Sequence, residues 1–256
     1  MVAGYALEKP LSDSEIVRYD RQLMIPGWGI DGQKKLKSSR VVVIGAGGLG
    51  SPASMYLAAA GVGHLKVVDK DRYELSNLNR QLLGWQKDIG RPKAEAAREK
   101  LEAINPEICV EALAVEVTKE NILDVLGGAD LAVDGTDNWS LRFIINEGCV
   151  KLQIPFIHAG VQGFFGQVTT IMPGLGPCLA CIMPRPPPDV DRFPVVGVTP
   201  GLFAMLEVME ALKTIVGIGP SLVGKILIFN GEDISFDLLE VSKDPKCKVC
   251  GKVGGL

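Results

Sequence analysis

An apolar segment that runs directly into a glycine-rich turn constrains the fold of this chain more than any other feature. Residues 40–44 read RVVVI, and residues 53–60 beyond the turn are mostly small. The turn between them reads GAGGLG and contains Gly45, Gly47, Gly48 and Gly50. A short apolar run suits a strand buried in a parallel sheet. Glycines before a helix let backbone N–H groups approach a phosphate. The sequence therefore predicts a strand–turn–helix unit that binds a nucleotide.

The elements expected after this unit continue the same alternation. Segments typical of strands lie at 65–69, 108–117 and 129–134, and segments typical of helices lie at 91–104 and 139–152. Strands that alternate with helices indicate a parallel sheet with crossover connections. We therefore predict an α/β fold with a Rossmann-like, mostly parallel sheet.

The second part of the chain has a different pattern. Residues 160–173 predict a hairpin, residues 199–216 predict a long helix, and residues 225–241 predict two strands around an Asn-Gly turn. This part is rich in strands but does not resemble an independent domain, so we predict one domain over residues 1–256. Its parts are predicted to be N-terminal helices at 1–40, a nucleotide-binding half at 41–159 and a β-rich half at 160–256.

The composition disfavours several classes of protein. The net charge is −3 at pH 7, whereas a dedicated nucleic-acid binder normally has an excess of basic residues. The long uncharged runs at 41–65 and 152–184 are interrupted by glycine and proline, which disfavour a membrane-spanning helix. The N-terminal residues lack the basic start and apolar core of a secretory signal. We therefore expect a cytoplasmic protein that binds neither nucleic acid nor membrane.

Charged side chains follow two of the predicted strands. Asp69 stands where a dinucleotide-binding fold has its ribose-binding carboxylate, and this residue with the glycines alone leaves an NAD-dependent oxidoreductase open. Arg80 and Lys93 favour a nucleoside triphosphate instead, because they can neutralise its outer phosphates. Asp134 and Asp137 end a later strand and would offer carboxylates to Mg²⁺.

Four of the six cysteines form two CxxC pairs, Cys178 with Cys181 and Cys247 with Cys250. Six cysteines in 256 residues are too few for a disulfide scaffold. Each pair is spaced so that both sulfurs can bind one tetrahedral zinc ion. Because the pairs are far apart in the chain, their spacing alone also allows two unrelated thiol pairs.

Several motifs together resemble a known family. They are RYDRQ, GAGGLGSPAS, DKDRYELSNLNRQ, GRPK, INP, DGTDN, GFFGQV and both CxxC pairs. In these motifs, over nearly its whole length, the chain resembles the ThiF/MoeB/HesA adenylyltransferases, relatives of the ubiquitin-activating enzymes. The resemblance implies an enzyme that uses ATP and Mg²⁺ to activate a ubiquitin-like sulfur-carrier protein of the ThiS or MoaD type, for thiamine or molybdopterin biosynthesis. The C-terminal Gly-Gly carboxylate of the carrier would attack the α-phosphate, giving an acyl-adenylate and pyrophosphate.

The resemblance also assigns roles to individual residues. The glycine-rich turn is expected to lie under the phosphates, and Asp69 to hold the ribose. The other nucleotide-binding residues are expected to be Asp71, Asn77, Arg80, Gln81, Lys93, Asp137 and Asn138. The catalytic residues are expected to be Asp137, Arg80, Lys93 and Arg21, with Asp137 also binding Mg²⁺. Arg21 would reach into the site of a neighbouring subunit, which implies a homodimer. The family also implies one zinc site, formed by Cys178, Cys181, Cys247 and Cys250.

One segment departs from the family pattern. Many members have a reactive cysteine after the first CxxC pair, but residues 182–197 contain none. We therefore expect the chemistry to stop at the acyl-adenylate. Adenylylation of a small-molecule or peptide carboxylate stays open as an alternative. An inactive scaffold that only binds a carrier is less consistent with the presence of Asp137, Lys93 and Arg80. The remaining cysteines and the histidines are expected to be structural, namely Cys109, Cys149, His64 and His158.

Overall fold

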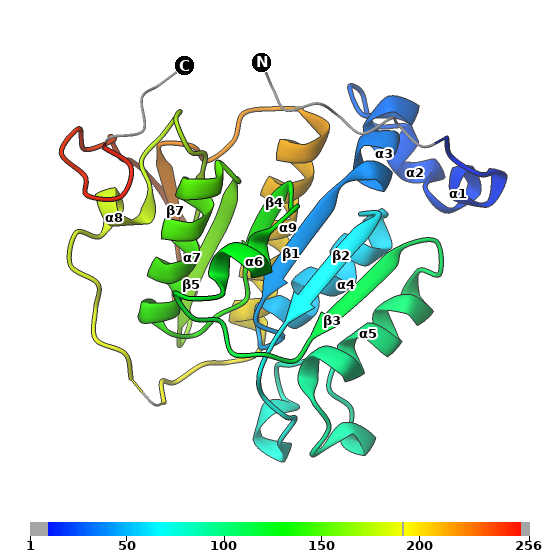
Figure 1. Cartoon of the computed structure of the whole chain (residues 1–256), viewed down its shortest axis with the longest axis horizontal. Helices are drawn as coiled ribbons and strands as arrows, with labels where there is room; N and C mark the ends of the chain where they lie inside the picture. Colours follow the sequence, from blue (N-terminus) through cyan, green and yellow to red (C-terminus); the bar gives the residue numbers. More distant parts are fainter. Residues whose placement is uncertain (1–9, 191, 252–256) are drawn as a thin grey trace.

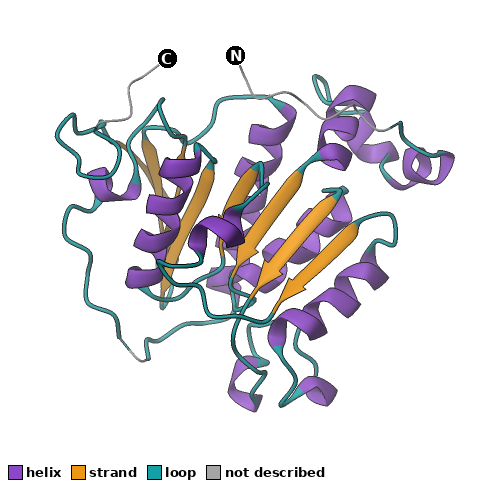
Figure 2. Cartoon of the chain, in the orientation of Figure 1, coloured by secondary structure: helices purple, strands orange, loops and turns teal. Residues whose placement is uncertain are grey.

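The computed structural model describes residues 10–190 and 192–251, and one eight-stranded sheet runs through it with helices on both faces (Figures 1 and 2). The strands are β1 (Arg40–Ile44), β2 (His64–Val68), β3 (Cys109–Leu113), β4 (Leu131–Asp134), β5 (Phe156–Gln162), β6 (Phe165–Ile171), β7 (Lys225–Asn230) and β8 (Ser235–Glu240). Their order across the sheet is β3-β2-β1-β4-β5-β6-β7-β8. Neighbours from β3 to β5 pair in parallel, and neighbours from β5 to β8 pair antiparallel. The predicted α/β fold with a mostly parallel sheet is confirmed.

The helices form three groups along the described chain. The N-terminal helices are α1 (Asp13–Arg18), α2 (Asp20–Leu23) and α3 (Gly29–Ser38). The helices between parallel strands are α4 (Gly50–Ala60), α5 (Lys93–Ile104), α6 (Ile122–Leu126) and α7 (Trp139–Leu152). The later helices are α8 (Leu179–Ile182) and α9 (Val198–Val216), and two short 3₁₀ turns, η1 (Leu75–Asn77) and η2 (Gln86–Asp88), lie between β2 and α5. None of these helices is both long and apolar enough to cross a bilayer.

Two apolar cores separate the layers. On one face of the sheet, α3, α4, α5 and α9 cover a core that includes Leu57, Leu101 and Phe203. On the other face, α6, α7 and α8 cover a second core that includes Ile145 and Phe156. Buried strand residues face both cores, which explains why β1 and β4 are apolar along almost their whole length.

The predicted strand–turn–helix unit is β1 followed by α4. At Gly50 an added Cβ would lie 1.8 Å from the carbonyl oxygen of Gly45, so only glycine fits this close approach. The same turn also packs against the chain after β4, where a Cβ at Gly135 would lie 2.2 Å from that oxygen. The glycines therefore bring the ends of β1 and β4 together.

Three elements differ from the sequence predictions. The hairpin begins at Phe156, because β5 pairs with β6 from its first residue, while Phe156 and Ile157 also pair in parallel with β4. The strand predicted at 108–117 ends at Leu113, and the residues beyond it turn toward the cleft described below. The short helix α6 was not predicted, since five residues are too few to show a helical period.

Cys109 was wrongly predicted as a core residue. It lies at the start of β3, an outer strand of the sheet, and its side chain is exposed. Cys149, in contrast, is buried in α7 as predicted. In the N-terminal part, Ser12 and Glu15 exchange the two hydrogen bonds of a capping box at the beginning of α1.

Candidate active site

A cleft of about 960 Å³ lies at the carboxyl ends of the parallel strands. Parallel strands present their following loops at one edge, which is where open α/β sheets bind ligands. In Figure 1 the arrowheads of β1, β2 and β3 point toward this edge. The cleft is lined by predicted site residues from several of these loops, namely Gly45, Gly47, Gly48, Asp69, Asp71, Arg80, Gln81, Lys93, Asp137 and Asn138.

Asp69 ties the glycine-rich turn to the end of β2. One carboxylate oxygen accepts from the backbone N–H of Ala46 at 2.7 Å, and the other accepts from the N–H of Asp71 at 2.8 Å. Burial raises the pKa of Asp69, although the charge of Lys93 and these two hydrogen bonds act in the opposite direction. The carboxylate is thus fixed beside the turn and open to the cleft.

Two cations flank the turn. Lys93 begins α5, its side chain is 7% exposed, and its Nζ lies 3.2 Å from a carboxylate oxygen of Asp71. Arg80 lies against the turn, since a Cβ at Gly48 would be 3.4 Å from its side chain. The Arg80 Nη1 donates to the carbonyl of Ser76 and to Oδ1 of Asn79, both at 3.0 Å. Positive charge is therefore held within reach of a phosphate chain lying over the turn.

Gln81 is buried at the same place, and its Oε1 has no hydrogen-bond partner among the described residues. Asn77 is not among the residues that line the cleft. Its side chain caps η1 by accepting from Glu74 N–H at 3.0 Å, and its carbonyl accepts from the N–H groups of Arg80 and Gln81. In the structure Asn77 thus shapes the turn that presents Arg80.

The residues after β4 form another part of the cleft wall. Asp137 is exposed at the cleft, and Asn138 caps α7 by accepting from Leu141 N–H at 2.8 Å. Asp134, which the sequence suggested as a second Mg²⁺ carboxylate, is fully buried instead. Its oxygens face His158, Arg142 and Thr136. Burial alone would raise the pKa of Asp134, but the charge of Arg142 and the hydrogen bonds from His158 and Thr136 lower it.

Sequence reasoning missed several residues at this site. Arg142, Arg192, Phe193 and Val195 line the cleft, and the last three belong to the crossover segment that joins α8 to α9. Asp189 of this segment accepts hydrogen bonds from the N–H groups of Trp139 and Ser140 at the start of α7. These contacts join residues about fifty positions apart, so no local pattern predicts them. For Arg142, the sequence offered one signal, which is its charge within the otherwise mostly apolar first half of α7.

Arg21 lies outside the cleft of its own chain. It is in α2, its side chain is 91% exposed, and its nearest ionic partner is the adjacent Asp20 at 3.9 Å. The structure thus does not bring Arg21 to the other predicted catalytic residues of the same chain.

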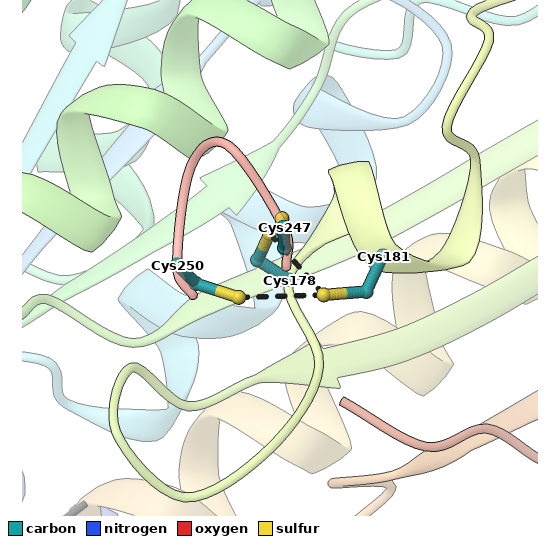
Figure 3. A group of neighbouring side chains, drawn as sticks. All are labelled: Cys178, Cys181, Cys247 and Cys250. Atoms are coloured by element: carbon teal, nitrogen blue, oxygen red, sulfur yellow. Dashed lines mark hydrogen bonds between the residues drawn. The ribbon is translucent and has the colours of Figure 1, made fainter. Parts of the chain in front are cut away.

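The two CxxC pairs meet on the α7 side of the sheet (Figure 3). The four sulfurs all lie within 4.8 Å of one another, and adjacent sulfurs of Cys178 and Cys247 and of Cys181 and Cys250 are 3.6 and 3.3 Å apart. A tetrahedral zinc ion with bonds of about 2.3 Å separates its sulfurs by about 3.8 Å. Burial raises the pKa of Cys178, and it raises the pKa of Cys250 to about 11. Burial acts in the same direction on Cys247, but the backbone N–H groups of Cys250 and Val249 lower its pKa to about 7. The cluster therefore fits a closed, structural zinc site.

Comparisons with known proteins agree with this geometry. The model of the ThiF family matches residues 19–249. The chain belongs to the ThiF family. A relative, the sulfur carrier protein adenylyltransferase of Thermus thermophilus, is 43% identical over 247 residues, covering 93% of this chain and 91% of the relative. The SAMP-activating enzyme E1 of Haloferax volcanii is 41% identical over 249 residues, covering 95% and 92%.

Solved structures share the fold of this chain. The crystal structure of E. coli MccB with ATP superposes with a TM-score of 0.80 at 27% identity, covering 92% of this chain and 75% of that one. Together with the named relatives, the family makes the chain a nucleotidyltransferase of the ThiF/MoeB type.

Proposed function

We propose that the chain transfers the adenylyl group of ATP to the C-terminal carboxylate of a ubiquitin-like sulfur-carrier protein and releases pyrophosphate. The observation that supports this most is the gathering of the glycine-rich turn, Arg80, Lys93 and Asp137 around one cleft. Attack of a carboxylate on a phosphate brings two anions together, so it needs positioned positive charge. Relatives named for a sulfur carrier protein and for SAMP activation support a small carrier protein as the acceptor.

The nucleotide would lie along the cleft with its phosphates over the glycine-rich turn. Backbone N–H groups at the start of α4 would donate to the phosphates, and Arg80 and Lys93 would neutralise them. Asp69 would accept from the ribose hydroxyls. Gln81 would donate from its side-chain Nε2, which lies 3.9 Å from a Cβ built at Gly47. Asn77 would act through the backbone turn that holds Arg80.

Asp137 would hold Mg²⁺ together with phosphate oxygens and water. Proteins commonly bind Mg²⁺ through one or two carboxylates plus substrate phosphates, and the Asp137 carboxylate is exposed at the cleft. When bound, the ion supplies positive charge to the phosphate oxygens as charge develops on them. Asp134 is unsuited as a second ligand, because both of its oxygens already have partners.

The carrier tail would enter beneath the crossover segment. Arg192, Phe193 and Val195 of that segment line the cleft, and the carbonyl of Pro194 accepts from Gly163 N–H at 2.7 Å. The absence of a cysteine from residues 182–197 supports an acyl-adenylate as the product of this chain. An external thiol or sulfur donor would then displace AMP from it.

The decisive experiment is ATP–pyrophosphate exchange by the purified chain with a panel of acceptors. We expect exchange that depends on a carrier ending in Gly-Gly and disappears when its last glycine is removed. Exchange with only small carboxylic acids or unrelated peptides would favour the alternative acceptor class. Tight binding of NAD with no exchange in the presence of any acceptor would contradict the proposed function.

We also propose that two subunits share each site through Arg21. Arg21→Ala and Asp137→Asn should each abolish exchange as homodimers. After the two variants are unfolded and refolded together, about a quarter of wild-type activity should return, because half of the dimers are mixed and each mixed dimer has one intact site. The variants refolded separately are the control. A mixture as inactive as its components would exclude a shared site.

A further inference from the structure

The catalytic loop is held by a buried polar cluster that the proposed mechanism does not use. The loop, Gly135–Asn138, follows β4 and presents Asp137 to the cleft. Within residues 10–190 and 192–251, the carboxylate of Asp137 has no hydrogen-bond or ionic partner. The direction of that carboxylate therefore depends on how the backbone on either side is held.

Thr136 is the most restrained residue of the loop. Its N–H and its hydroxyl both donate to Oδ1 of Asp134, at 2.9 and 2.7 Å. Its carbonyl accepts from Nη2 of Arg142 at 2.8 Å. Every polar atom of Thr136 thus bonds to one of two buried, oppositely charged side chains.

Those two side chains are themselves fixed. The other Asp134 oxygen, Oδ2, lies 2.6 Å from Nδ1 of His158 and 3.2 Å from Nε of Arg142. The His158 ring is buried against Trp139 and Phe156, and the Arg142 guanidinium lies 4.7 Å from the centre of the Trp139 ring. Arg142 therefore contacts the chain on both sides of Asp137, through Thr136 before it and Trp139 after it.

We propose that Asp134, clamped by Arg142 and His158, is a positioning residue that aims Asp137 through Thr136. The proposal rests on the proposed adenylyl transfer, since it concerns the placement of that reaction's Mg²⁺-binding carboxylate. A buried ion pair is often no more stabilising than apolar residues of the same size. Its value here lies in holding one loop in one geometry, because misplacement of a reacting group by about 1 Å can lower a rate by roughly a hundredfold.

The test compares Thr136→Val with Thr136→Ser. Valine removes only the hydroxyl bond to Asp134 and keeps the shape, whereas serine keeps the hydroxyl. We expect Thr136→Val to lower the kcat of ATP–pyrophosphate exchange about tenfold and to raise the Mg²⁺ concentration for half-maximal rate, with little change in the KM for carrier. Thr136→Ser should keep the kcat and the Mg²⁺ concentration for half-maximal rate close to those of the wild type.

A matched control separates positioning from simple loss of a buried hydrogen bond. Thr170 is buried in β6, and its hydroxyl donates to the buried carboxylate of Glu210 at 2.6 Å, away from the cleft. Thr170→Val should lower the melting temperature about as much as Thr136→Val but leave kcat and the Mg²⁺ dependence unchanged.

The possible outcomes are distinct. Unchanged kinetics in Thr136→Val, or an equal kinetic loss in Thr170→Val, would overturn the positioning role while the wild type still exchanges. A loss in Thr136→Ser as large as that in Thr136→Val would also overturn it, because the hydroxyl would then be irrelevant. Absence of exchange in the wild type with every acceptor would instead overturn the proposed function, and the positioning role with it.

Discussion

Asp137→Asn is expected to abolish ATP–pyrophosphate exchange while leaving the fold intact. The Asp137 side chain is exposed at the cleft and takes no part in core packing, so replacing one oxygen by an amide nitrogen costs the fold little. The substitution removes the negative charge that would bind Mg²⁺, an ion that prefers anionic oxygen ligands. Loss of one group that stabilises developing charge lowers kcat by roughly 10²–10³-fold, and we expect an effect of at least that size.

The measurement is exchange at saturating carrier and varied Mg²⁺, with the melting temperature as the test of folding. Asp124→Asn is the matched control, because Asp124 is an exposed aspartate on α6 that does not line the cleft. Near-normal exchange in Asp137→Asn would show that another group holds the metal. A similar loss in Asp124→Asn would show that net charge, not this position, matters.

Removal of zinc is expected to produce the largest change in stability. Without the ion, four thiols would face one another in a cluster that is mostly buried, and the turn at Cys247–Cys250 would lose its attachment to α8. Zinc binding to small structural sites releases on the order of 10–16 kcal/mol. If about 4 kcal/mol of this is coupled to global unfolding, the melting temperature should fall by roughly 8–16 °C.

The melting temperature should be measured with and without a chelator, and again after zinc is restored. Cys247→Ser should melt like the chelated protein and should not respond to added zinc. Cys109→Ser is the control, since this exposed thiol lies outside the cluster. Equal melting of the zinc-loaded and chelated protein would rule out a structural metal.

Local sequence patterns were sufficient to place β1, β2 and β4 of the parallel part of the sheet. The apolar runs of β1, β2 and β4 end where glycine or aspartate begins, so their position and direction follow from the chain itself. The start of β5 could not be found in this way. All seven residues of β5 pair with β6, and Phe156 and Ile157 also pair in parallel with β4. The place of β5 therefore depends on partners elsewhere in the sheet and not on residues 156–162 alone.

The candidate site was also predictable in part, namely for the residues that belong to sequence motifs. Arg80 and Lys93 belong to motifs between the end of β2 and the start of α5, and Asp137 follows β4, so their meeting in one cleft follows from the topology. The burial of Asp134 could not be predicted, because Asp134 and Asp137 are both aspartates near the end of the same strand. Only the structure shows that the Asp134 side chain is buried and that the Asp137 side chain is exposed at the cleft. Asp134 points to His158 and Arg142, which lie on β5 and α7 and are brought to it only by folding.

The change from parallel to antiparallel pairing at β5 separates the strands that border the cleft from those that do not. Among the described residues, those lining the cleft include residues at the ends of β1, β2, β4 and β5, but none from β6, β7 or β8. Substitutions in β6, β7 and β8 can therefore change the surface of these strands without changing the residues that line the cleft. Under the proposed function, a lineage of such enzymes could exchange one carrier for another by changing this end of the sheet, while the residues that line the cleft stay the same.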